Sequence, residues 1–98
     1  MNTYRQGDVL FIQIDSIPED AKPQISNIVV EGETTGHAHR LQGGQIMITA
    51  TAMYIACHLQ ASHIVHEEHR TITLPPGVYE VRRQREYVSP ELTRQVLD

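Results

Sequence analysis

The feature that most constrains the fold of this chain is how closely turn residues follow one another. Stretches rich in valine, isoleucine and tyrosine are short, and glycine, proline or paired acidic residues interrupt them at intervals of about 8 to 12 residues. No stretch shows the apolar repeat of a long amphipathic helix. The sequence therefore predicts an all-β fold, either a small barrel or a sandwich.

The strand pattern can be placed along the chain from these interruptions. The expected strands cover residues 7–14, 28–33, 35–41, 45–50, 53–59, 62–66, 70–74 and 78–88. Residues 21–27, which include Pro23, are expected to form a loop, and Gly43 and Gly44 to form a turn. Ser89 followed by Pro90 is typical of a helix start, so we expect at most a short C-terminal helix over residues 90–97.

Alternation within the strands predicts which side chains face the core. In residues 53–59 the apolar positions recur at every second residue, and in strands such positions share one face. The expected core face consists of Met53, Ile55, Cys57 and Leu59. Tyr79 and Val81 share a face of the last strand in the same way.

The size of the chain predicts one domain and a partner. The 98 residues contain no repeat or linker, so residues 1–98 are expected to form a single β domain. A domain this small buries a modest core, and a second copy could cover its sheet edges. We therefore expect a homo-oligomer, most simply a dimer.

Charge, cysteine content and apolar run length limit the classes of function. The formal net charge of −4 excludes a general basic surface for nucleic acid, so only a small RNA or a nucleotide is considered as such a partner. A single cysteine, Cys57, allows no internal disulfide. The apolar runs are too short to cross a bilayer, and the N-terminal residues do not have the layout of a signal peptide. Together these features predict a cytoplasmic protein with no membrane contact.

Histidine is the unusual component, with six in the chain. His37 and His39 are two residues apart, and in a strand such residues point to the same side. Two imidazoles on one side of a sheet can bind a divalent metal. The alternative is a pair of polar histidines that face solvent. Arg40 follows directly and is a further candidate for chemistry.

A second histidine pair is contained in the run His66-Glu67-Glu68-His69. The two rings lie side by side if Glu67 and Glu68 form a hairpin tip, and also if the run forms one helical turn. The spacing differs from that of the HxxEH metalloprotease motif. Glu-Glu is a poor tight-turn sequence, which suggests another reason for these carboxylates. A solvated hairpin tip is the alternative.

Two further histidines, His58 and His63, lie in the same part of the chain, and for each of them a structural role is expected. Cys57 belongs to a core-like alternation and is expected to be buried rather than nucleophilic. The sequence contains no P-loop, GxGxxG, CxxC or GxSxG motif.

The third candidate group lies on the last expected strand. Arg83, Arg85 and Tyr87 share one face there, and a guanidinium beside a tyrosine suits a phosphate, a carboxylate or a stacked base. We therefore treat these three as candidate ligand-binding residues. The alternative is that the arginines form cross-strand ion pairs. The acidic residues considered as their partners are Glu31, Glu33, Glu67 and Glu68.

Four segments together resemble a family of short uncharacterised bacterial proteins. They are RQGDVLF at residues 5–11, GETTGHAHR at 32–40, HEEH at 66–69 and LPPGVYEVRRQREY at 74–87. The resemblance covers nearly the whole chain. It implies an all-β fold and carries no activity with it.

A looser resemblance is to the cupin barrels, whose strands carry an HxH pair and, after a PxG turn, a third histidine. His37 and His39 match the HxH pair, and residues 75–77 match the PxG turn. The pattern departs from the cupin one because no glutamate follows His39 at four or five residues and because Glu80 stands at the third histidine position. The resemblance implies that His66 or His69 would complete such a site.

Three hypotheses of function remain open, and the sequence does not establish whether the protein is an enzyme. The first is a site for Zn, Fe, Mn or Ni, or for a small ligand, which could support metal-assisted hydrolysis or oxygen chemistry. The second is a non-catalytic module that binds a partner through a sheet edge. The third is a metal-free phosphodiesterase or ribonuclease with histidine acid–base groups, in which Arg40, Arg83 or Arg85 would hold the phosphate. The candidate metal ligands are His37, His39, His66 and His69, and these four and Arg40 are the candidate catalytic residues.

Overall fold

The structure is a computed structural model, and it describes residues 2–32 and 36–84. All strand pairs in these residues are antiparallel, and none of these residues is helical. The all-β prediction is therefore confirmed. The expected helix at residues 90–97 and the end of the last expected strand lie outside the described residues.

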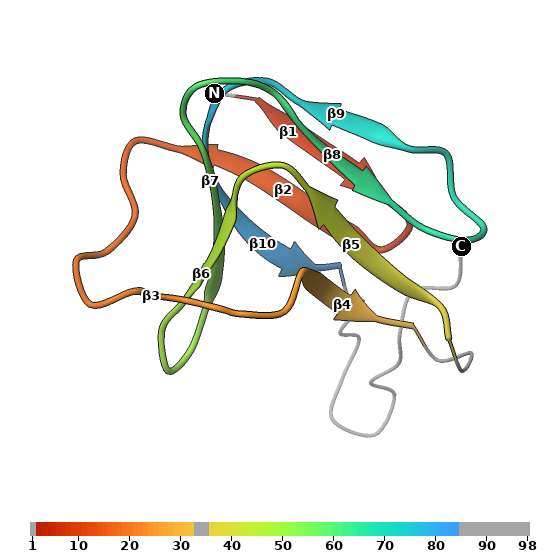
Figure 1. The fold of residues 1–98 in the computed structure, drawn as a ribbon, viewed down its shortest axis with the longest axis horizontal. Helices are drawn as coiled ribbons and strands as arrows, with labels where there is room; N and C mark the ends of the chain where they lie inside the picture. The colour runs from red at the N-terminus through yellow and green to blue at the C-terminus, as the bar shows by residue number, and fades with distance from the viewer. Residues whose placement is uncertain (1, 33–35, 85–98) are drawn as a thin grey trace, which may run out of the picture.

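Two sheets pack face to face in a small sandwich (Figure 1). The larger sheet has the order β1 (Thr3–Gln6), β2 (Val9–Ile14), β10 (Gly77–Arg83), β7 (Met53–Cys57), β6 (Gln45–Ile48) and β3 (Lys22–Pro23). The smaller sheet has the order β4 (Ile28–Glu31), β5 (Ala38–Gln42), β8 (Ser62–Val65) and β9 (Ile72–Leu74). In the described residues the two sheets do not close into a barrel, so of the two predicted architectures the structure has the sandwich.

The core lies between the two sheets, and the alternation of the strands produces it. Ile55 and Cys57 are buried as predicted, and Tyr79 is buried with them. The remaining members of the buried cluster are Val9, Phe11 and Ile46 from the larger sheet and Val29, Leu41, Ile64 and Leu74 from the smaller one. Leu59 was expected on this face but is exposed, because β7 ends at Cys57 and the chain turns away before Leu59.

The strand boundaries differ from the predictions at the N-terminal end. The expected strand over residues 7–14 is β2, which begins only at Val9, and a turn at Gly7 and Asp8 joins it to the strand β1, which was not predicted. Gly7 has a φ of 60°, a left-handed conformation that favours glycine. The expected loop at residues 21–27 contains the two-residue strand β3.

No helix of the described residues is long and apolar enough to cross a membrane.

Candidate metal centre

The register of β5 and β8 brings two of the candidate histidines together. Arg40 pairs with Val65, and Leu41 pairs with Ile64. One step further in the same register places His39 opposite His66. Side chains directly opposite each other in an antiparallel pair lie on the same face and touch. The register of this strand pair therefore accounts for the 4.5 Å distance between the centres of the two rings.

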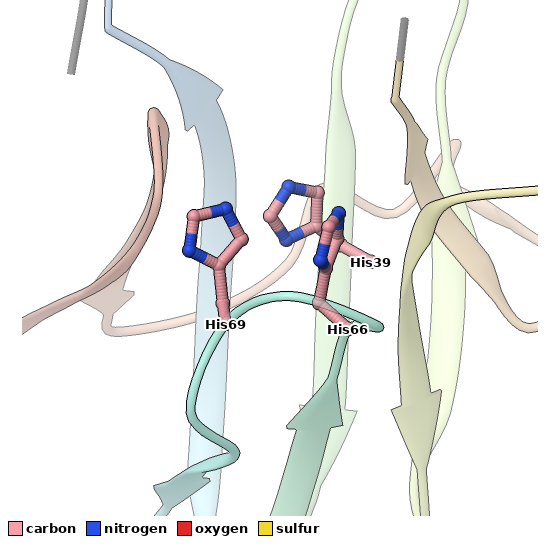
Figure 2. Close-up of side chains that lie close together, drawn as sticks. All are labelled: His39, His66 and His69. Atoms are coloured by element: carbon pink, nitrogen blue, oxygen red, sulfur yellow. The ribbon is translucent and has the colours of Figure 1, made fainter. Parts of the chain in front are cut away.

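His69 joins this pair from the segment that connects β8 and β9. Its ring centre lies 4.5 Å from that of His66 and 5.7 Å from that of His39. One ligand nitrogen from each of the three rings can be chosen so that all lie within 4.8 Å of one another. Figure 2 shows the three rings gathered around a common space. Nitrogens on a tetrahedral metal lie about 3.3 Å apart, so these rings are a little more open than a closed metal site.

His39 is the buried member of the group, with 4% of its surface exposed. Its Nδ1 lies 2.8 Å from Oε1 of Gln6, which is also buried. Burial first, and then the neighbouring His66 and His69, lower the pKa of His39 to about 4. His39 is therefore neutral at neutral pH, which is the state that binds metals.

His66 is half-buried and directly follows the last residue of β8, Val65. Its pKa is lowered, first by burial and then by His69. The backbone N–H of Glu68 donates to Nδ1 of His66 at 3.0 Å, so a neutral His66 carries its proton on Nε2. A metal bound to His66 would therefore replace either this proton or the Glu68 N–H.

His37 lies beside the group but outside it. Its ring meets that of His66 edge to face, with the centres 5.9 Å apart. Its Nδ1 lies 3.5 Å from a carboxylate oxygen of Glu68. The two-residue spacing predicted that His37 and His39 point to the same side. Both rings lie beside that of His66, but of the two it is His39 that belongs to the set with converging ligand nitrogens.

Glu67 explains part of the unusual Glu-Glu sequence. Its carboxylate accepts the backbone N–H of Ala38 at 2.9 Å and an N–H of Arg40 at 2.6 Å. The Ala38 N–H first, then its own backbone N–H, and then Arg40 lower the pKa of Glu67 to about 2. Glu67 thus holds the histidine-bearing segment against β5, and the Arg40 guanidinium is engaged in this ion pair.

The turn between β1 and β2 forms another side of the group. A Cβ atom on Gly7 would lie 2.9 Å from Nε2 of His69 and 3.5 Å from Cε1 of His39. The next residue, Asp8, accepts a hydrogen bond from Arg83 at 2.9 Å. Arg83 therefore forms an ion pair, the alternative considered above, but its partner is Asp8, which was not among the glutamates named there. Of those glutamates, Glu33 lies outside the described residues.

The other sequence candidates do not join the group. Arg85 and Tyr87 lie outside the described residues. His58 and His63 are exposed, and neither belongs to the converging set found in the described residues.

The sequence did not point to Gln6 and Gly7 as part of the site. A polar residue at the end of a short strand and a glycine in a turn have no sequence pattern that indicates which residues they contact.

The comparisons with known proteins match the chain to one family. A family model described as a domain of unknown function (DUF8820) matches residues 5–84. This range includes all the residues of the histidine group and those that contact it. No curated protein and no solved structure matches the chain.

Proposed function

Since the chain belongs to this family of domains of unknown function (DUF8820), we propose its function from its own side chains: it binds a divalent transition metal through His39, His66 and His69. The observation that carries the proposal is the convergence of three imidazoles from β5 and from the segment after β8. Three neutral imidazoles suit Zn, Fe, Mn or Ni and leave a coordination position for water or substrate.

Neighbouring groups support the proposal. Burial keeps His39 neutral, and the carboxylate of Glu67 holds the segment that carries His66 and His69. His37 and Glu68 lie next to His66, so further nitrogen and carboxylate groups are close to the three rings. When bound, such a metal would supply Lewis acidity for hydrolysis or, as iron or manganese, redox chemistry.

Elemental analysis tests the proposal directly. Protein purified without a histidine tag is expected to contain stoichiometric zinc, iron, manganese or nickel, or to take up Zn²⁺ after treatment with a chelator. Titration of the metal-free protein with Co²⁺ is expected to give the visible absorption bands of a nitrogen-bound, four- or five-coordinate ion. Absence of both the native metal and the Co²⁺ bands would contradict the proposal.

A second candidate function is metal-free acid–base chemistry on a phosphodiester. The observation that favours it is the hydrogen bond from the Glu68 N–H to Nδ1 of His66, which leaves Nε2–H of that ring free to donate a hydrogen bond to a phosphate oxygen, beside the neutral His39 as a base. Against it, Arg40 and Arg83 are both engaged with carboxylates. Hydrolysis of a model phosphodiester that persists in excess chelator would favour this candidate over the metal site.

The homodimer and the cytoplasmic location remain our proposals. In the described residues β3 and β4 are edge strands, and a second copy could pair with such an edge. The same edges could serve a non-catalytic partner. Light scattering is expected to give the mass of a dimer, and a monomer at high concentration would contradict this proposal.

A further inference from the structure

We propose that Gln6 is the positioning residue of the histidine group: it selects the tautomer of His39 and holds the segment that carries His66 and His69. Its consequence for metal affinity rests on the proposed metal function. The tautomer itself is a property of the metal-free protein and can be tested separately.

The hydrogen bonds of the Gln6 amide fix its orientation. A glutamine amide has two N–H donors on nitrogen and an oxygen that only accepts. The Gln6 Nε2 donates to the backbone carbonyls of Ile64 and Arg70, each at 2.9 Å. In the reversed orientation, Oε1 would face two carbonyl oxygens, and all three atoms could only accept. Because Gln6 is 3% exposed, water cannot readily compensate for that mismatch.

The orientation of the amide determines the tautomer of His39. With Nε2 of Gln6 directed at the two carbonyls, Oε1 faces Nδ1 of His39 at 2.8 Å. Oε1 can only accept, so Nδ1 must carry the proton and donate it. A neutral His39 then has its lone pair on Nε2. This is the arrangement of many metal-bound histidines, in which the second ring nitrogen donates to a carbonyl or carboxylate.

The same amide also constrains the other two rings. Ile64 and Arg70, whose carbonyls it binds, lie on either side of the segment that contains His66 and His69. Gln6 belongs to β1 of the larger sheet, whereas β5 and β8 belong to the smaller one. One side chain therefore links the position of β1 to all three candidate ligands.

The first test is the tautomer of His39 in the metal-free protein, which long-range ¹H–¹⁵N correlation spectra report. At pH 7.5 we expect the Nδ1–H form, whereas histidine in water prefers the Nε2–H form. An Nε2–H tautomer of His39 in the wild-type protein would overturn the inference without any substitution. A role of Gln6 in stability alone predicts no particular tautomer.

Two substitutions separate the two parts of the inference. Gln6→Met keeps the length and removes all three hydrogen bonds, so His39 is expected to lose the Nδ1–H form and Zn²⁺ affinity to fall by about 10- to 100-fold. Gln6→Glu keeps an acceptor for His39 and removes both donors. It is expected to retain the Nδ1–H form while its Zn²⁺ affinity falls less than that of Gln6→Met.

Gln24 offers a matched control. Its Nε2 also donates to two backbone carbonyls, those of Ser26 and Ile28, each at 3.0 Å. Neither of these hydrogen bonds involves a histidine of the group or the segment that carries His66 and His69. Gln24→Met is expected to leave the His39 tautomer and the Zn²⁺ affinity unchanged. The inference is wrong if folded Gln6→Met keeps both the Nδ1–H form and the wild-type affinity.

The outcomes remain distinguishable if a variant does not fold or if no metal binds. If Gln6→Met does not fold, the spectra of the wild type and of Gln6→Glu decide the assignment. If the wild type contains no native metal and binds neither Zn²⁺ nor Co²⁺, the proposed metal function fails, and the tautomer of His39 still confirms or refutes the role of Gln6 in the metal-free protein.

Discussion

Histidines lie at both ends of the β5–β8 strand pair, but they gather into a cluster at one end only. At one end His39 and His66 lie opposite each other, and His69 joins them. At the other end His63 pairs with Gln42 and is exposed. In β8 the buried positions are Ser62 and Ile64, so His66 continues the inward alternation and His63 lies on the outward one. Strand alternation and cross-strand register, rather than histidine content, therefore create this candidate site.

The turn glycines near the two ends also differ in whether they contact the histidines. Gly7 and Gly43 both have positive φ, at 60° and 79°. A Cβ on Gly7 would meet the rings of His69 and His39, whereas on Gly43 the nearest atom is the Ala61 carbonyl oxygen at 3.7 Å. Both turns therefore need a residue that tolerates a positive φ, but only the turn at Gly7 contacts the histidines.

The largest expected effect is on metal affinity when histidines at the two ends are replaced. His66→Ala and His69→Ala are each expected to lower Zn²⁺ affinity by more than about 100-fold, because the loss of a ligand exceeds the effect of a supporting residue. His58→Ala and His63→Ala are the matched controls and are expected to bind as the wild type does. Competition titrations with a chelating dye measure these affinities. If the control variants lost as much Zn²⁺ affinity as His66→Ala and His69→Ala, the two ends would not differ in metal binding.

The next effect is on stability as a function of pH. The pKa of His39 is about 4 in the folded chain, against 6.5 for an ordinary histidine, so between these pH values the unfolded chain binds a proton that the folded chain does not. Stability should therefore be unaffected above pH 6.5 and should fall by about 3 kcal/mol as the pH drops through this window. His66, whose pKa is also lowered, contributes in the same direction.

Urea unfolding of the metal-free protein at several pH values measures this loss. His39→Asn is expected to be less stable at neutral pH and to show a smaller decrease between pH 6.5 and 4. His63→Ala, the control at the other end of the strand pair, is expected to keep the wild-type dependence. An unchanged pH dependence in His39→Asn would show that other groups, such as His66 or the carboxylates, cause the loss rather than His39.

The smallest effect is expected from the two glycines. Gly7→Ala and Gly43→Ala are each expected to lower the free energy of unfolding by about 1–2 kcal/mol, because alanine disfavours the left-handed conformation. Only Gly7→Ala is expected to weaken Zn²⁺ binding as well, since its methyl group would displace the ring of His69. Thermal unfolding and Zn²⁺ titration of both variants check this. Equal Zn²⁺ affinities in the two variants would remove Gly7 from the site.

The parts of the site that were predictable depend on short-range geometry. His37 and His39 are two residues apart, and His66 and His69 are three apart, so any local conformation limits how far their rings can separate. The core face of β7 was predictable for a similar reason, since Ile55 and Cys57 follow a strict alternation. The alternation did not indicate that β7 ends at Cys57, and Leu59 was therefore misplaced.

The missed parts depend on which strands are neighbours. Asp8 meets Arg83 because β2 pairs with β10, and the two residues are 75 positions apart. The strand β1 was not predicted because its four residues include one apolar side chain, Tyr4. Gln6 ends that strand. A glutamine is ordinarily expected at the surface, but Gln6 is buried because β1 packs beside β9.

The long sequence separations around Gln6 have a kinetic consequence. Its amide joins residues 58 and 64 positions away, and its bond to His39 spans 33 positions. We expect contacts this distant to form late in folding, because the entropy of closing long loops is lost before such contacts stabilise the chain. A metal held by this group would then bind after the folding barrier and would act chiefly on the rate of unfolding. It would lengthen the lifetime of the folded chain rather than speed its formation.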